Sequence, residues 1–197
     1  GVLGRIGEIA ARQKKPGTKA MIVSETNVFP LYGERAKASL EQAGFQVSAF
    51  VFPAGEAHKQ ISTICDMYKA LSQAGFTRTD FIVTLGGGVT GDMGGFAAAT
   101  FLRGIDFFQV PTSLLSMVDA SVGGKTGVDL PFGKNLVGAF HQPMAVAADT
   151  EALRTLPDYF FRDGMGELIK HGCIADKQLF ADLQAGAALH SLEEVIG

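Results

Sequence analysis

Short, mostly apolar runs recur along the first 150 residues and are separated by amphipathic segments. Five of these runs have the length and composition of β-strands: Ala20–Val23, Phe45–Phe52, Phe81–Leu85, Phe107–Val110 and Ala145–Ala148. The third run is apolar almost throughout, which is typical of a parallel strand that is covered on both faces. The pattern therefore predicts a sheet with a buried centre.

Apolar side chains recur at helical spacing between the first three strands, over residues 30–43 and then from Ile61 to Leu71. Gly44 and Gly75 follow these segments, at the position where glycine commonly ends a helix in the left-handed conformation. Alternating strands and helices predict an α/β fold, a Rossmann-like open, mostly parallel sheet with helices on both faces.

The composition changes near Asp149, and from Leu153 to Ile196 the pattern is only helical, with Pro157 at a helix start. We therefore expect residues 1–150 to form a nucleotide-binding domain. Residues 151–197 would be the first helices of a second, all-helical domain, which 47 residues are too few to complete.

Glycine is unusually frequent, with 25 of 197 residues, and it concentrates after the third strand. There Gly86, Gly88 and Gly91 match G-x-G-x-x-G between a strand and a predicted helix. Such glycines allow a tight turn and let backbone N–H groups at a helix N-terminus approach a pyrophosphate. The loop predicts a phosphate or dinucleotide site, although close packing alone can also select glycine.

A dinucleotide fingerprint usually has an acidic residue about 20 positions further on, at a strand end. Asp106 has nearly this spacing but precedes its strand, so it should lie at the wrong edge of the sheet. A carboxylate for the ribose would have to be Glu25 or Glu56. The competing P-loop interpretation of Gly124-Lys125-Thr126 lacks its first glycine, because residue 119 is aspartate.

The segment from Arg103 to Asn135 carries lysines and other polar residues among many glycines. This composition suits an anionic substrate, and a solvated hairpin is the alternative. Further on, Glu167 and His171 share one helix face because they are four residues apart. They could bind a metal, or Glu167 could form an ordinary surface pair with Lys170.

Bulk properties narrow the class of protein. The 17 basic and 20 acidic residues give a net charge of −3, which argues against nucleic-acid and anionic-membrane partners. Cys65 and Cys173 are too few for a disulfide framework, and we expect free, buried thiols. No secretory signal is recognisable, so a cytoplasmic location is the expectation.

Several motifs, in order and with matching spacing, closely resemble the 3-dehydroquinate synthase family. They are Gly86–Asp92, Val110–Leu115, Asp119–Thr126, Gly133–Asn135 and Gly164–Lys170, and the likeness runs from about Val23 to Asp182. The resemblance implies conversion of 3-deoxy-arabino-heptulosonate 7-phosphate to 3-dehydroquinate and phosphate. It also implies NAD⁺, a divalent metal (zinc or cobalt) and a homodimeric full-length enzyme.

The resemblance also implies site residues. Substrate or catalytic positions are matched by Arg103 (acting from the partner subunit), Asp119, Lys125, Lys134, Asn135 and Lys170, and the metal ligand by Glu167. Cofactor positions are matched by Ala54, Gly55, Glu56, Ala57, His58, Lys59, Gly88, Val89, Thr90, Gly91, Asp92, Thr112, Ser113, Lys125, Lys134, Ala152, Leu153, Arg154 and Thr155.

Some positions depart from the family pattern. His171 stands where tyrosine is usual, so the resemblance removes it as a ligand, while Glu25 and Ser113 replace a common aspartate and threonine. Family members are nearly twice as long, and the two histidines that complete the metal site belong to their C-terminal part. We therefore expect this chain to be incomplete for turnover by itself.

Three alternatives remain. A related sugar-phosphate cyclase would share most motifs, a glycerol-dehydrogenase-like enzyme would share the fold, and a pure NAD-binding module would share the glycine loop.

Overall fold

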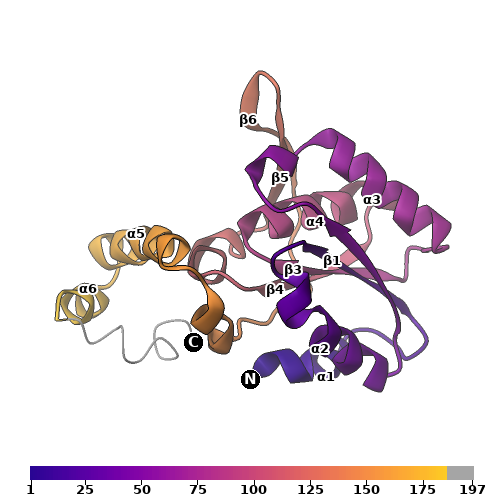
Figure 1. Ribbon diagram of the computed structural model, residues 1–197, viewed down its shortest axis with the longest axis horizontal. Helices are drawn as coiled ribbons and strands as arrows, with labels where there is room; N and C mark the ends of the chain where they lie inside the picture. Colours follow the sequence, from indigo (N-terminus) through magenta and orange to yellow (C-terminus); the bar gives the residue numbers. More distant parts are fainter. Residues whose placement is uncertain (186–197) are drawn as a thin grey trace.

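A computed structural model describes residues 1–185 and contains one five-stranded parallel sheet with the order β2-β1-β3-β4-β7. Its strands are β1 (Lys19–Glu25), β2 (Gln46–Phe52), β3 (Phe81–Gly86), β4 (Asp106–Pro111) and β7 (Ala145–Val146). All four pairings are parallel, so the predicted sheet is confirmed (Figure 1). The last strand is shorter than predicted.

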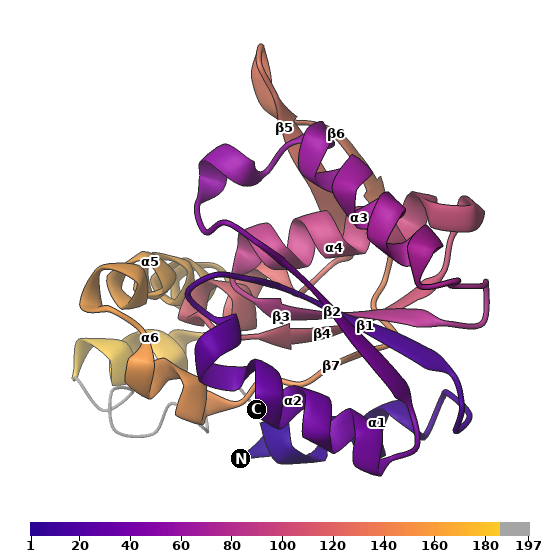
Figure 2. The same ribbon diagram turned by 45° about the vertical axis from the view of Figure 1, so that its right-hand side comes forward.

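Helices cover both faces of the sheet (Figure 2). They are α1 (Ile6–Ala10), α2 (Phe29–Gln42), α3 (Ile61–Gln73) and α4 (Gly88–Thr100). Alternate strand residues face opposite ways, so Met21 and Val23 pack in the cluster that contains α3 and α4. Ala20 and Ile22 pack in the cluster that contains α1 and α2. The two-sided core explains why β3 is buried at every position.

A separate antiparallel hairpin leaves this layered body (Figure 1). It consists of β5 (Lys125–Leu130) and β6 (Gly133–Phe140). Its first strand lies against α4, where the buried Val128 joins the core cluster on that side of the sheet. The polar, glycine-rich segment of the sequence therefore forms a hairpin that is anchored at its base.

The described residues after Asp149 are helical, as predicted, in a 3₁₀ segment (Thr150–Thr155), α5 (Asp158–Ile174) and α6 (Lys177–Gln184). Leu168 of α5 packs in a small cluster with Leu114 and Met117. The predicted helical pattern beyond residue 185 lies outside the described residues. Among those described, none of the helices has the length and apolar composition needed to cross a membrane.

Both cysteines are free, but both are exposed, so the expectation of buried thiols is wrong. Cys65 lies on α3, whose inward positions are occupied by larger residues such as Ile64 and Met67. Helical spacing allowed either face, and Cys65 falls on the outer one.

Asp80 stabilises the turn that leads into β3, and its replacement by alanine should lower the free energy of unfolding by about 2 kcal/mol. Its carboxylate accepts hydrogen bonds from the Lys19 N–H at 2.8 Å and the Thr77 N–H at 2.6 Å. Although burial opposes ionisation, these bonds hold the pKa of Asp80 below its usual value. The folded state therefore favours the carboxylate, and its contribution is lost as pH falls through that lowered pKa.

Urea unfolding of Asp80→Ala at pH 7 and in acid measures this effect. The control is Asp66→Ala, which removes an exposed aspartate of α3. A destabilisation of Asp80→Ala that persists unchanged at pH 2 would contradict the carboxylate's role.

Candidate functional site

The glycine loop lies at a topological switch point of the sheet. The chain passes from β1 to β2 on one side of β1, and then crosses to β3 on the other side of β1. The carboxyl ends of β1 and β3 therefore flank the crevice where open α/β sheets bind ligands. Gly87 precedes α4 as its N-cap, and Gly88 is the first helical residue. The free N–H groups of the helix start therefore face this edge, as a pyrophosphate site requires.

Two glycines of α4 lie close to the sheet. A Cβ on Gly91 would lie 2.5 Å from Nε2 of Gln109, and one on Gly94 would lie 2.3 Å from Cγ2 of Thr84. Both neighbours belong to the buried sheet, so α4 sits closer to the strands than side chains would allow. The third motif glycine, Gly91, lies in this close helix–sheet contact, as it does in dinucleotide folds.

The predicted acidic positions lie where the sequence placed them. Asp106 opens β4 at the opposite edge of the sheet and pairs with Lys14 at 2.6 Å. Glu25 is the last residue of β1, at the same edge as the glycine loop. Glu56 follows β2 in a short 3₁₀ turn and pairs with Lys134 at 3.1 Å, between two exposed side chains. Asp106 is therefore excluded from the crevice.

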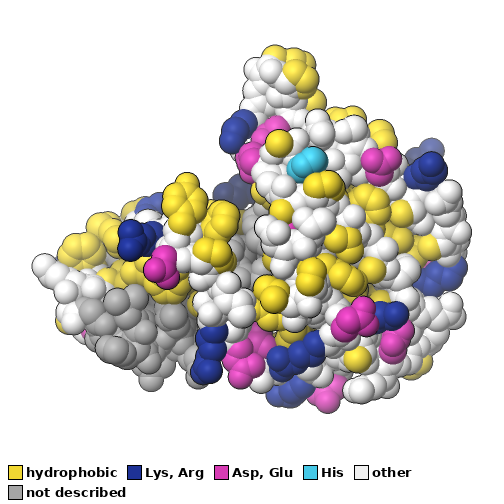
Figure 3. All heavy atoms as spheres, in the orientation of Figure 1, with side chains coloured by type: hydrophobic (Ala, Val, Ile, Leu, Met, Phe, Trp, Pro, Cys, Tyr) yellow, Lys and Arg dark blue, Asp and Glu magenta, His cyan; other side chains and the backbone are white. Residues whose placement is uncertain are grey.

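A cleft of about 540 Å³ opens between the start of α4 and the hairpin. Its lining includes the predicted residues Asp92, Asp119, Lys125 and Asn135, together with Ala120, Thr126, Gly127, Gly138, Ala139 and Phe140. In the space-filling view the surface is indented between the hairpin and the C-terminal helices (Figure 3). The hairpin alternative and the anionic-substrate hypothesis are thus compatible, because the hairpin forms one wall of the cleft.

Lys125 opens a strand of this hairpin and no helix follows it, so the P-loop alternative is excluded. The hairpin residues that the sequence did not single out, Gly138 to Phe140, line the cleft through the second strand. Alternation along that strand was obscured by glycine, so no sequence signal identified them.

A buried lysine joins two walls of the cleft. The Nζ atom of Lys59 lies 2.7 Å from the Asp92 carboxylate and donates a hydrogen bond to Oδ1 of Asn135 at 2.8 Å. Only 6% of the Lys59 side chain is exposed. Burial raises the pKa of Asp92 above its usual value, while the hydrogen bond and charge of Lys59 act in the opposite direction.

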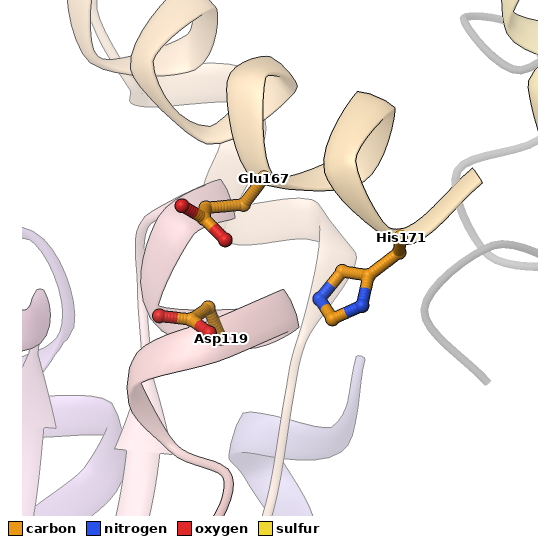
Figure 4. A group of neighbouring side chains, drawn as sticks. All are labelled: Asp119, Glu167 and His171. Carbon is orange, nitrogen blue, oxygen red and sulfur yellow. The ribbon is translucent and has the colours of Figure 1, made fainter. Parts of the chain in front are cut away.

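A second polar cluster joins α5 to the helical turn Ser116–Ala120 (Figure 4). Ligand atoms of Asp119, Glu167 and His171 lie within 4.8 Å of one another. The Lys170 ammonium contacts Glu167 and lies 3.5 Å from Asp119, and these partners raise the pKa of Lys170. Nε2 of His171 is buried and has no hydrogen-bond partner among the described residues.

This donor set fits a divalent metal of the zinc or cobalt kind, since two carboxylates and one imidazole are ligands that such ions accept. The arrangement also places His171 in the cluster, although the family resemblance assigns it no role. The side chains project from two elements that are distant in sequence and meet where α5 crosses the turn (Figure 4).

Two of the remaining cofactor positions, Thr112 and Ser113, border the glycine loop. The Thr112 N–H donates to the Gly86 carbonyl at 3.0 Å, and a Cβ on Gly87 would lie 3.5 Å from Oγ of Ser113. Thr112 and Ala152 line one small cavity with Tyr32, whose hydroxyl donates to the Ala152 carbonyl at 3.2 Å. The segments around residues 112 and 152 therefore meet beside the loop.

Arg103 lies away from these groups. It follows the C-terminal end of α4, at the opposite edge of the sheet from the glycine loop, and its φ of 69° is left-handed. Its guanidinium is exposed and forms no hydrogen bond or ion pair with the described residues. The structure thus brings Asp92, Asp119, Lys125 and Asn135 together in one cleft and leaves Arg103 outside the cleft of its own chain.

Comparison with known proteins gives concordant results. A family model described as 3-dehydroquinate synthase N-terminal matches residues 49–163. The 3-dehydroquinate synthase of Symbiobacterium thermophilum is 49% identical over 191 residues, which is 96% of this chain and 53% of that protein. The chain spans about half the length of the curated relatives it matches.

Two solved structures resemble this fold closely. One is 2-deoxy-scyllo-inosose synthase complexed with carbaglucose-6-phosphate, NAD⁺ and Co²⁺, with a TM-score of 0.80, 32% identity and coverage of 86% of this chain and 46% of that one. The other is ValA, the 2-epi-5-epi-valiolone synthase from Streptomyces hygroscopicus, with NAD⁺ and Zn²⁺ bound. Its TM-score is 0.78 at 29% identity, over 98% of this chain and 57% of that one.

These structures share the fold, and the family model covers more than half of the chain, including the strand, glycine loop and helix that build the cleft. On this evidence the chain belongs to the 3-dehydroquinate synthase family.

Proposed function

We propose that this chain is the nucleotide-binding part of a 3-dehydroquinate synthase, which converts 3-deoxy-D-arabino-heptulosonate 7-phosphate to 3-dehydroquinate and phosphate. The observation that carries the proposal is the glycine loop at the switch point, which opens beside a cleft lined by Asp92, Lys125 and Asn135. Relatives that are about 50% identical are all named 3-dehydroquinate synthase, which favours this activity over that of the related cyclases.

The proposed cofactor is NAD⁺, which supplies a reversible hydride acceptor when bound. In the proposal, Gly88–Asp92 contact the cofactor, the free N–H groups at the start of α4 bind its pyrophosphate, and Thr112 and Ser113 lie beside them. The turn Ala54–Lys59 and the segment Ala152–Thr155 flank the nucleotide. Glu25, which ends β1 at the same edge of the sheet, would accept hydrogen bonds from the ribose.

Substrate groups are proposed to bind in the cleft and the adjoining polar cluster. Lys125 and Lys134 would pair with anionic groups at the junction with the cofactor, and Asn135 would orient hydroxyls by hydrogen bonds. Asp119 would accept a hydrogen bond from a substrate hydroxyl, and Lys170 of α5 would donate one to the substrate. These contacts would hold the ring in one orientation through alcohol oxidation, phosphate elimination, re-reduction and aldol closure.

Glu167 is the proposed metal ligand in this chain, and its carboxylate is oriented toward Asp119 (Figure 4). A bound zinc or cobalt ion would acidify the substrate alcohol as a Lewis acid. Lys170, which contacts Glu167, would then be released to face the substrate.

We further infer a cytoplasmic homodimer with a domain boundary near residue 150. Arg103 is compatible with the dimer, because its exposed guanidinium has no partner among the described residues and lies far from the cleft of its own chain. A small phosphorylated substrate, and no nucleic acid or membrane, is the proposed partner.

The alternatives make different predictions for the complete enzyme. A related cyclase would release phosphate from a different sugar phosphate, whereas a glycerol-dehydrogenase-like enzyme would accumulate NADH. A cyclase returns its hydride and leaves the NADH concentration unchanged.

Calorimetric titration with NAD⁺ tests the cofactor proposal. In Gly88→Trp the indole would occupy the start of α4, next to Ala120, whose Cβ lies 3.4 Å from a Cβ built on Gly88. We expect at least a hundredfold loss of NAD⁺ affinity with the circular dichroism spectrum retained. Ser72→Trp, on the exposed side of α3, adds the same indole elsewhere and should bind NAD⁺ normally. Equal affinity of the wild type and Gly88→Trp would refute the site.

A further inference from the structure

A closed ring of hydrogen bonds lies behind one wall of the cleft. The Asp129 N–H donates to the Lys59 carbonyl, and Oδ1 of Asp129 accepts from the Asn135 N–H, both at 2.8 Å. The ring closes where the Lys59 ammonium donates to Oδ1 of Asn135, also at 2.8 Å. Asp129 thus contacts both of the other members, and it is not itself among the residues that line the cleft.

This ring holds in place two residues that line the cleft, Asn135 and Asp92. Asn135 has a left-handed backbone with φ of 55°, a conformation that is unfavourable for most residues and that its hydrogen bond to Asp129 helps to hold. Lys59 extends the ring to the Asp92 carboxylate on α4. The hairpin and the start of α4 are therefore connected through three side chains.

Asp129 is suited to this role by its chemistry. Its backbone pairs with the chain preceding α3 through a parallel bridge to Gln60, while its carboxylate turns toward the second strand of the hairpin. An oxygen acceptor at this position is what the Asn135 N–H needs, because Asn135 falls in the register shift of the hairpin, opposite Val128–Leu130, where the ladder gives it no partner.

We propose that Asp129 is a positioning residue: it holds the Asn135 amide and, through Asn135 and Lys59, the Asp92 carboxylate of the Gly88–Asp92 segment that is proposed to bind NAD⁺. The inference rests on the proposed function, because it assigns a role in that same cleft. It adds a residue that neither touches the cleft nor belongs to the positions matched by the family resemblance.

The test compares Asp129→Ala with Asp129→Asn. Asparagine keeps an oxygen that can accept the Asn135 N–H, whereas alanine removes it. We expect Asp129→Ala to bind NAD⁺ about tenfold more weakly and Asp129→Asn to stay within about threefold of the wild type. Asp66→Ala controls for the loss of one negative charge. Should Asp129→Ala fail to fold, Asp129→Ser, whose hydroxyl is too short to reach, replaces it.

Amide hydrogen exchange of Asn135 in the unliganded chain gives an independent readout, and we expect it to be at least tenfold faster in the alanine variant only. Absence of NAD⁺ binding by the wild type would overturn the proposed function. Normal wild-type binding with equal affinity in Asp129→Ala, or an equal loss in Asp129→Asn, would overturn the positioning role alone.

Discussion

Replacing Lys59 with methionine is expected to lower the free energy of unfolding by about 3 kcal/mol at pH 8. The Lys59 side chain is 6% exposed, and its ammonium lies 2.7 Å from the carboxylate of Asp92, whose side chain is 23% exposed. Methionine fills nearly the same volume but has no charge, so the carboxylate stays in the protein without a partner. Breaking one side of a buried pair costs more than the pair itself contributes.

The loss should depend on pH in a defined direction. Burial raises the pKa of Asp92 in the folded protein, and Lys59 opposes that rise, so removing Lys59 raises the pKa of Asp92 further. A folded-state pKa above the unfolded value means that stability falls as pH rises through this interval. Lys59→Met should therefore be most destabilised at neutral and alkaline pH and approach the wild type near pH 4. Urea unfolding at several pH values measures the difference.

Lys134→Met provides the matched control. Its ammonium pairs with Glu56 at 3.1 Å, but the two side chains are 71% and 46% exposed. An exposed pair of this kind contributes less than about 1 kcal/mol, so the same substitution should have little effect on stability at any pH. Equal losses in the two variants, or a Lys59→Met deficit that is largest in acid, would refute the buried-pair account.

The sheet was predictable from sequence because its strands are buried on both faces. Phe81–Leu85 needed no alternation of polar residues to be recognised, and the glycines after it identified the edge where a ligand could bind. The order of chain segments then predicted parallel pairing, which the register of β1 with β2 and β3 confirms.

The hairpin was predictable only as an alternative, because glycine interrupts both of its strands. A Cβ on Gly138 would lie 2.1 Å from the Thr126 carbonyl oxygen, and one on Gly127 would lie 2.7 Å from that of Val137. Glycine here permits the two strands to approach closely, whereas in a sequence it first indicates a loop. For this reason the two strands that form one wall of the cleft could not be predicted from the sequence.

Proximity between site residues was the other feature that the sequence could not supply. Lys59, Asp92 and Asn135 come from three separate segments, and their contacts depend on how the hairpin packs against α4. Helical spacing predicted that Glu167 and His171 share a face. It could not predict that Asp119 would lie opposite them, since that depends on how closely α5 approaches the turn at residues 116–120.

Gly164 controls that approach, and its replacement by alanine should lower the free energy of unfolding by about 3 kcal/mol, the upper end of the range for overpacking. A Cβ at this position would lie 2.6 Å from the Leu115 backbone nitrogen and 2.6 Å from Cβ of Leu114. Backbone cannot rotate away as a flexible side chain can, so α5 must move outward. Because Glu167 lies one turn further along the same helix, the cluster with Asp119 should open as well.

Gly166→Ala separates this effect from helix propensity, because the position lies on the same helix and a Cβ there would meet nothing within 4 Å. We expect this variant to gain about 0.5–1 kcal/mol, the usual benefit of alanine over glycine inside a helix. Thermal unfolding and Co²⁺ titration of both variants, read by calorimetry, measure stability and the integrity of the cluster. If Gly164→Ala matched Gly166→Ala in both, close contact between α5 and residues 114–115 would not be what holds Glu167 opposite Asp119.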